Sequence, residues 1–272
     1  MHHSLLELLE TRRISPAVQY DEKRKALVAG DGQVFRGVCP TIHSLFFPHY
    51  KYRPIETTAM APSPPQVSLV PLPPLLSGRV APKVPTRPPT GLETGVRVDQ
   101  ELTKAIREIV RNGGNVRSYL TGLFKRPKQE RIHHRTRSIL RWLVEMGYRP
   151  VAAQLPVSST KGRVATLVDI VCYDQKTNRF ILIETKSGFD DYYDTGSGCQ
   201  LQGSASFLKR SDSPRNQHQL QLLATSLLFC ATFKFSLTSI DAKVVRITDS
   251  CLYTYPLSAW AIEGTKAVAS LL

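Results

Sequence analysis

Two apolar segments near the middle of the chain, 165–173 and 180–185, each contain one carboxylate. Apolar side chains occupy both sets of alternating positions, which is typical of strands buried on both faces of a sheet. Asp169 interrupts the first segment, and Glu184 lies near the end of the second. A buried and unpaired carboxylate is so costly that it would normally take up a proton. The two carboxylates therefore need a compensating partner.

The spacing of these residues predicts that both carboxylates meet at neighbouring strand ends. Asp169 and Glu184 are 15 residues apart with a polar turn between them, so the strands can pair as a hairpin. Lys186 shares a strand face with Glu184. Carboxylate oxygens and the carbonyl oxygen of Thr185 are hard ligands suited to Mg²⁺ or Mn²⁺. Lys186 beside such a site can orient an attacking water, an arrangement that fits phosphodiester hydrolysis. The alternative is a structural ion pair at a sheet edge.

The other elements follow from periodicity and from helix start and stop signals. Asp99 is expected to cap a helix over 99–110, and Gly147 is expected to end a helix over 128–146. The remaining expectations are helices over 116–124, over 215–229 and from 258, strands over 148–157, 242–247 and 250–257, and a loop over 187–213. This order predicts an α/β fold with a mixed sheet covered on both faces.

The sequence divides into three parts by composition. Residues 1–53 form a small N-terminal segment, with a predicted hairpin that joins 26–29 to 33–38. Residues 54–98 form a proline-rich linker, because 11 of the 19 prolines lie between Pro54 and Pro89. It is interpreted as a spacer arm, or alternatively as a proline-motif ligand for a protein partner. Residues 99–272 form the main domain.

The motifs of this domain resemble the PD-(D/E)XK nuclease superfamily. Val-Asp-Ile-Val around Asp169 and Ile-Glu-Thr-Lys-Ser-Gly with Glu184 and Lys186 carry the resemblance, and the glycine after the lysine is similar to the RecB-like and lambda-exonuclease-like branches. The resemblance covers about 99–272. It implies a restriction-endonuclease-like α/β sandwich, with a central mixed sheet flanked by helices and here preceded by the proline-rich N-terminal arm. Two departures are Val168 in place of the motif's proline and Thr225 in place of an aromatic residue.

The resemblance also implies roles for individual residues. In these branches a glutamine on the helix after the sheet binds the attacking water or a phosphate, and His-Gln-Leu-Gln supplies Gln219 and Gln221, with Gln217 one turn before Gln221. A glutamate on the helix before the sheet corresponds to Glu130, whose alternative role is as a solvated partner of His134. The candidate catalytic residues are Asp169, Glu184, Lys186, Gln221 and Glu130, and the candidate ligands of Mg²⁺ or Mn²⁺ are Asp169, Glu184 and Thr185.

The net charge of +14 and the sequence pI of about 9.7 favour a polyanionic partner over a merely solvated basic surface. DNA, single- or double-stranded, is the expected partner. Basic residues around the helix before the sheet supply phosphate contacts, although Lys-Arg-Pro-Lys at 125–128 also fits a nuclear import signal. The candidate nucleic-acid-binding residues are Lys125, Arg126, Lys128, Arg131, His134, Arg135, Arg137, Lys209, Arg210, Arg215, Gln217 and Gln219.

Together these expectations predict a Mg²⁺-dependent DNA nuclease, which would be an exonuclease or a processing enzyme of replication, recombination or repair. The alternative is a module of the same fold that binds nucleic acid or protein without cutting. The five cysteines include no Cys-x-x-Cys pair, so a reducing intracellular compartment is expected, the nucleus or mitochondrion among them. No segment is long and apolar enough to predict a membrane span.

Overall fold

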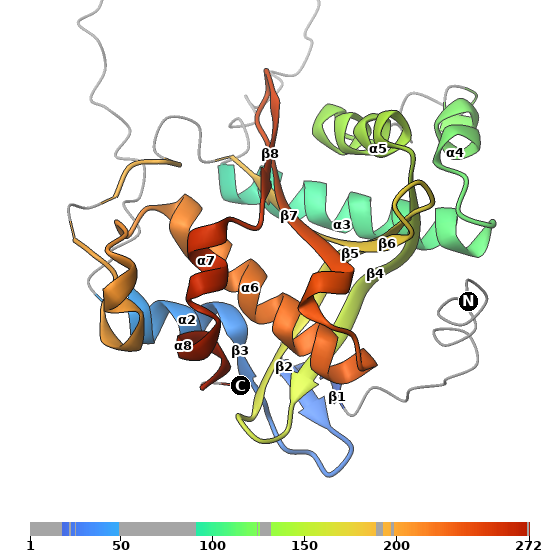
Figure 1. Ribbon diagram of the computed structural model, residues 1–272. Coiled ribbons are helices and arrows are strands. Elements are labelled where there is room, and N and C mark those ends of the chain that lie inside the picture. The colour runs from blue at the N-terminus through green and yellow to red at the C-terminus, as the bar shows by residue number, and fades with distance from the viewer. Residues whose placement is uncertain are drawn as a thin grey trace, which may run out of the picture.

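The computed structural model describes residues 18–21, 23–24, 26–48, 91–123, 125, 132–188, 193–196, 199–270 and 272. Within these residues the chain has an α/β architecture in which a six-stranded mixed sheet lies between two groups of helices (Figure 1). The strands are β3 (Arg36–Gly37), β4 (Tyr148–Ser159), β5 (Val164–Asp174), β6 (Arg179–Ser187), β7 (Ile240–Ile247) and β8 (Leu252–Pro256).

The sheet is mixed because its strands pair in both directions. The order is β3-β5-β6-β7-β8, and β4 pairs with β5 as well. β6 and β7 are parallel, as are β3 and β5, whereas β4–β5, β5–β6 and β7–β8 are antiparallel. The parallel β6–β7 connection contains a long helix, as a parallel crossover requires.

One face of the sheet is covered by α3 (Gly91–Arg111), α4 (Val116–Leu123) and α5 (His134–Met146). On α3 the buried residues recur at helical spacing, which gives the helix an apolar stripe; they are Val98, Leu102, Ala105, Ile106 and Ile109. This stripe belongs to one core with the sheet residues Ile170, Ile181 and Ile183. As predicted, α5 ends at Gly147, which adopts a left-handed conformation (φ 72°).

The other face is covered by α6 (Pro214–Phe233), α2 (Val38–Phe46) and several short helices. Ser213 caps α6 by accepting a hydrogen bond from the backbone nitrogen of Asn216 (3.3 Å), and Pro214 starts the helix, where no N–H partner is needed. The short helices are η2 (Gly203–Leu208), η3 (Leu237–Ser239), α7 (Ala259–Glu263) and α8 (Thr265–Ala269). No described helix has the length and apolar content to cross a membrane.

The predicted α/β class with a mixed, helix-flanked sheet is confirmed, with different element boundaries. The helix predicted over 99–110 begins at Gly91, so Asp99 lies inside α3 rather than capping it. The helix predicted from 128 is described from His134, and the final helix is divided into α7 and α8. The predicted loop over 187–213 contains η2. The proline-rich sequence over 54–90 lies outside the described residues.

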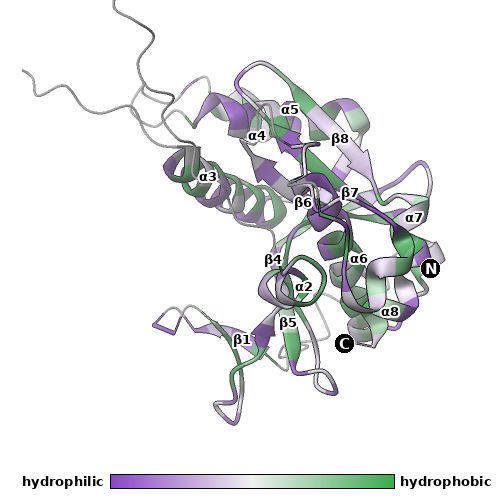
Figure 2. Ribbon diagram, turned by 90° about the vertical axis from the view of Figure 1, so that its left-hand side faces the viewer, coloured by the Kyte–Doolittle hydropathy of each residue, from purple (hydrophilic) through white to green (hydrophobic). Residues whose placement is uncertain are grey.

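The N-terminal hairpin consists of β1 (Val18–Asp21) and β2 (Ala26–Ala29), which pair with each other. The predicted pairing of 26–29 with 33–38 forms only in part, because Val28 bridges to Val34 whereas residues 36–37 pair with β5. The chain then enters the sheet as β3 and forms α2, a helix that the sequence analysis did not predict. Figure 2 shows the β1 region extending to one side of the sheet.

Residues 36–47 therefore belong to the same folded unit as the helices and strands after 91. Val38, Ile42, Phe46 and Phe47 are at most 3% exposed, and they share one core with α6 and the sheet. The predicted boundary between an N-terminal segment over 1–53 and a domain over 99–272 does not describe this packing. Apolar side chains of α2 cover part of the sheet that residues after 99 leave open.

Phe46→Ala is expected to lower the free energy of unfolding by about 3–5 kcal/mol, since it removes a buried aromatic ring from the core. Phe46 is 1% exposed, and the adjacent Leu45 is 42% exposed, which makes Leu45→Ala a matched control. The control is expected to change the stability by less than about 0.5 kcal/mol. Urea unfolding followed by circular dichroism measures both variants. Equal effects of the two substitutions would show that α2 is not part of the core.

Candidate active site

The sheet forks at the middle of β5, where one edge of this strand is shared by two neighbours. β6 pairs with residues 170–174 of β5, and β3 pairs with Val164 and Ala165. Residues 166–169 lie between these two pairings. Asp169 is the first residue past the last β5–β6 pair, Ile170 with Ile183, and Glu184 is its counterpart on β6. The fork therefore brings the two predicted carboxylates to adjacent positions.

Asp169 is held at the fork by donors from β6 and β4. Its Oδ2 accepts hydrogen bonds from the backbone nitrogen (2.8 Å) and the Oγ1 (3.0 Å) of Thr185. Its Oδ1 accepts from Nε2 of Gln154 on β4 (3.3 Å). The carboxylate thus satisfies a backbone N–H that has left the β5–β6 ladder.

Glu184 is 4% exposed and lies between β6 and α6. Its Oε1 accepts hydrogen bonds from Nζ of Lys186 (2.6 Å) and from Nε2 of Gln221 (2.6 Å). Gln221 is itself buried on α6. The structure therefore brings together five sequence-predicted residues, Asp169, Glu184, Thr185, Lys186 and Gln221, with Lys186 and Gln221 on the same oxygen of Glu184.

The electrostatics of the site are set by the buried Glu184, the partly exposed Asp169 and the ammonium of Lys186. Burial raises the pKa of Glu184 to about 7, the Asp169 carboxylate adds to the rise, and Lys186 opposes it. Burial by itself would lower the pKa of Lys186, but the Glu184 carboxylate and its neighbours raise it above its usual range. Lys186 therefore stays a cation at neutral pH.

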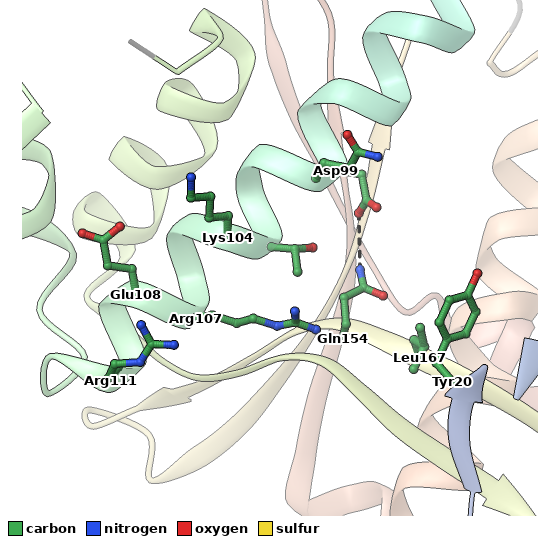
Figure 3. Close-up of a pocket in the computed structure, with 10 residues that line it drawn as sticks. Tyr20, Asp99, Lys104, Arg107, Glu108, Arg111, Gln154 and Leu167 are labelled. Carbon is green, nitrogen blue, oxygen red and sulfur yellow. Dashed lines mark hydrogen bonds between the residues drawn. The ribbon is translucent and has the colours of Figure 1, made fainter. Parts of the chain in front are cut away.

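Two further residues at this site, Gln154 and Asp99, were not predicted from the sequence. Nε2 of Gln154 donates to Oδ1 of Asp99 on α3 (3.3 Å), as Figure 3 shows. It also donates to Oδ1 of Asp169, so the amide bridges two carboxylates. Gln154 has a φ of 52°, which is uncommon for a residue other than glycine. Residues with such a backbone conformation cluster at functional sites. Burial, and then the charge of Asp169, raises the pKa of Asp99 to about 6.

The ligand set fits Mg²⁺ or Mn²⁺ better than zinc. Within the described ranges no three His, Cys, Asp or Glu side chains gather to hold a metal, as a zinc site requires. Mg²⁺ instead keeps several waters and needs only one or two carboxylates. Asp169 and Glu184 supply these. The carbonyl of Thr185, which lies between Glu184 and Lys186 in sequence, can supply a further oxygen, so the residues present fit the group.

The predicted nucleic-acid contacts before the sheet are only partly described. Arg126, Lys128, Arg131 and the candidate catalytic Glu130 lie outside the described residues, whereas Lys125 is exposed. Arg135 differs from its prediction as a phosphate contact. It is 6% exposed, and its guanidinium binds Asp249 (2.8 Å) and Oγ of Ser187 (2.8 Å). The ion pair ties α5 to the turn between β7 and β8, and the hydrogen bond to Ser187 ties it to the end of β6.

Two neighbours of Arg135 on α5 also make local contacts. Nε2 of the half-exposed His134 lies 3.0 Å from Oδ1 of the same Asp249. The guanidinium of Arg137 donates to the carbonyl of Ile132 (3.5 Å). These contacts leave His134 accessible at the surface.

The predicted contacts around α6 also divide into exposed and internal residues. Lys209 and Arg210 are exposed, and Arg215 pairs with Asp194 (3.0 Å). Gln217 donates to the carbonyl of Asp212 (3.1 Å). Gln219 is not placed to bind nucleic acid, because it is 2% exposed and its Oε1 accepts from the backbone nitrogen of Ser258 (2.8 Å).

The raised pKa values of Glu184 and Asp99 predict a pH-dependent stability. Between about pH 5 and 8 the folded state keeps protons that the unfolded state has lost, so these groups lower the stability as the pH rises. Thermal melts with a chelator should show a smaller decrease in Tm over this range for Glu184→Gln than for wild type. Mg²⁺ should raise the wild-type Tm more at pH 8 than at pH 5, because a cation offsets the repulsion.

The matched control is Glu263→Gln, which removes an exposed carboxylate from α7. Its Tm should follow the wild-type pH profile, since other titrating groups contribute to both proteins alike. Identical profiles for Glu184→Gln and wild type would contradict the assigned pKa of Glu184.

A comparison with models of known protein families finds no match for this chain, and a comparison with curated proteins also finds none. Among solved structures, a chain described as the crystal structure of SSO0001 is similar over 65% of this chain and 70% of that chain. The sequence identity is 14% and the TM-score is 0.27. A similarity of this size carries no argument about function, so the candidate site depends on its own geometry.

Proposed function

We propose that this protein is a Mg²⁺- or Mn²⁺-dependent nuclease with a restriction-endonuclease-like fold of the PD-(D/E)XK type. One observation carries the proposal: Asp169 and Glu184 from neighbouring strands meet at the fork in β5, with Lys186 and Gln221 both on Glu184. Carboxylates at adjacent positions repel each other, and a divalent cation is the partner that best offsets the repulsion.

Each residue has a distinct part in this proposal. Asp169, Glu184 and the carbonyl of Thr185 would hold the cation, which when bound supplies Lewis-acid chemistry for phosphodiester hydrolysis. Thr185 orients Asp169 through its backbone nitrogen and its hydroxyl. Gln221 fixes the rotamer of Glu184. Lys186 is a cation with its ammonium 2.6 Å from Glu184, where it can orient the attacking water and stabilise negative charge that develops on the phosphate.

DNA is the proposed substrate, with a role in replication, recombination or repair. The excess positive charge of the chain supports a polyanionic substrate. All five cysteines are free, which supports a reducing intracellular compartment such as the nucleus or mitochondrion. A protein of this fold that only binds nucleic acid would have no use for Lys186 beside Glu184, so cleavage assays separate the two functions.

Lys186→Ala is expected to lower the rate of Mg²⁺-dependent cleavage by about 10²–10⁴-fold, the usual contribution of a positioned acid–base group. The assay uses labelled linear, circular and single-stranded DNA, and a melt establishes that the variant is folded. Lys186→Gln, which keeps a donor for Glu184, should lose activity as well. Lys266→Ala on α8 removes an exposed lysine and should cleave like wild type. Wild-type rates for folded Lys186→Ala would overturn the proposal.

Gln221 and Gln219 allow a paired test, since both are buried on α6 but contact different groups. Gln221→Met removes a donor to Glu184 worth about 1.5–3 kcal/mol, so cleavage should fall by roughly 10–100-fold. Gln219→Met leaves Ser258 without its acceptor and should lower stability by about 1–3 kcal/mol, with little change in rate. The measurements are initial rates on labelled DNA and urea unfolding. The reverse pattern would remove Gln221 from the active site.

A further inference from the structure

A pocket beside the fork has no part in the chemistry described so far. Its volume is about 750 Å³, within the range of roughly 300–1,000 Å³ typical of ligand-binding clefts. It lies between α3, β4, β5 and the N-terminal hairpin (Figure 3). The residues that line it are Tyr20, Asp99, Gln100, Thr103, Lys104, Arg107, Glu108, Arg111, Gln154 and Leu167.

One side of the pocket is the polar face of α3. Lys104, Arg107 and Arg111 are exposed there, and their spacing of three and four residues places them on one side of the helix. Seven residues of helix span about 10 Å, so the cations form a row rather than a single point. The opposite stripe of α3 is buried in the core. Burial of that stripe fixes the direction in which the cations face.

The pocket is connected to the candidate active site by a hydrogen-bonded chain. Gln154 and Asp99 line the pocket, and the Gln154 amide joins Asp99 to Asp169 at the fork. In Figure 3 Arg107 extends along the pocket toward Gln154. A polyanion lying over Arg111 and Arg107 would therefore lead to the carboxylates.

The far side of the pocket is apolar and aromatic. Tyr20 of β1 and Leu167 of β5 lie beyond Gln154 (Figure 3). Tyr20 is 44% exposed, so its ring is available to a ligand. An exposed aromatic ring next to a row of cations is the combination that binds unpaired nucleotides, with bases stacked on the ring and phosphates on the cations. A duplex keeps its bases paired inside and offers no base for such stacking.

We propose that this pocket binds a single strand of nucleic acid and leads it to Asp169 and Glu184. Lys104, Arg107 and Arg111 bind consecutive phosphates, and Tyr20 stacks on an unpaired base. The inference rests on the proposed nuclease function and assigns its substrate class as an unpaired strand. It also gives the N-terminal hairpin a role as one wall of the substrate path.

The test is the binding of a fluorescein-labelled 12-nucleotide single-stranded DNA, measured by anisotropy with a chelator present so that cleavage is excluded. Arg107→Ala and Arg111→Ala should each weaken binding by about 3–10-fold. Each should also reduce the slope of log K against log salt by about 0.7, the value for one lost phosphate contact on a single strand. Lys266→Ala removes the same charge far from the pocket in sequence and on a different helix, and should change neither quantity.

Two further variants distinguish a nucleic-acid strand from a general polyanion. Tyr20→Leu should weaken binding of the DNA by about 3-fold or more without changing the salt slope, whereas heparin binding should be unaffected. Glu108→Gln removes a carboxylate from among the pocket cations and should tighten DNA binding by about 2–3-fold. A gain in affinity cannot arise from a destabilised fold.

The outcomes separate this inference from the nuclease proposal. Wild-type affinity and salt slope in Arg107→Ala and Arg111→Ala would overturn the pocket as the substrate path, even if Lys186→Ala has lost cleavage. An unlabelled duplex that competes as well as the single strand, or a Tyr20→Leu variant that binds normally, would overturn the single-strand assignment. Loss of binding in the arginine variants supports the inference whether or not the protein cleaves DNA.

Discussion

The shared edge of β5 is the constraint on which the candidate site depends. β6 and β3 both pair with this edge, at opposite ends, and the residues between them have no partner on that side among the described strands. A backbone N–H released from a ladder must find another acceptor when it is partly buried. The nitrogen of Thr185 finds it in Asp169. The hydrogen bond that satisfies the backbone N–H of Thr185 therefore also sets the position of the Asp169 carboxylate.

The elements packed around the fork then supply different environments to the two carboxylates. On the α6 side Glu184 is enclosed with Lys186 and Gln221, and its charge is stabilised by a hydrogen bond of 2.6 Å from each of them. On the α3 side Asp169 shares the Gln154 amide with Asp99, near an open pocket. The site is thus closed behind Glu184 and accessible beside Asp169. This asymmetry defines the side from which a substrate can approach.

The parts of the structure that the sequence predicted are those with a strong local pattern. Strands buried on both faces are recognisable in the sequence as runs of apolar residues. The alternation of side chains along a strand was enough to place Glu184 and Lys186 on one face. α2 was not predicted because Pro40 and a short apolar run favour a turn or strand, although proline is tolerated in the first turn of a helix.

The residues that the sequence placed wrongly depend on tertiary contacts. α3 was expected to begin at Asp99 because aspartate is a favoured helix cap, whereas the helix begins at Gly91. Gln154 and Arg135 acquire their roles only from partners distant in sequence, such as Asp99 and Asp249.

The pairing of β3 with β5 has a consequence for the order of folding. Residue 36 leaves the ribosome long before its partner at 164, so the fork closes late in synthesis.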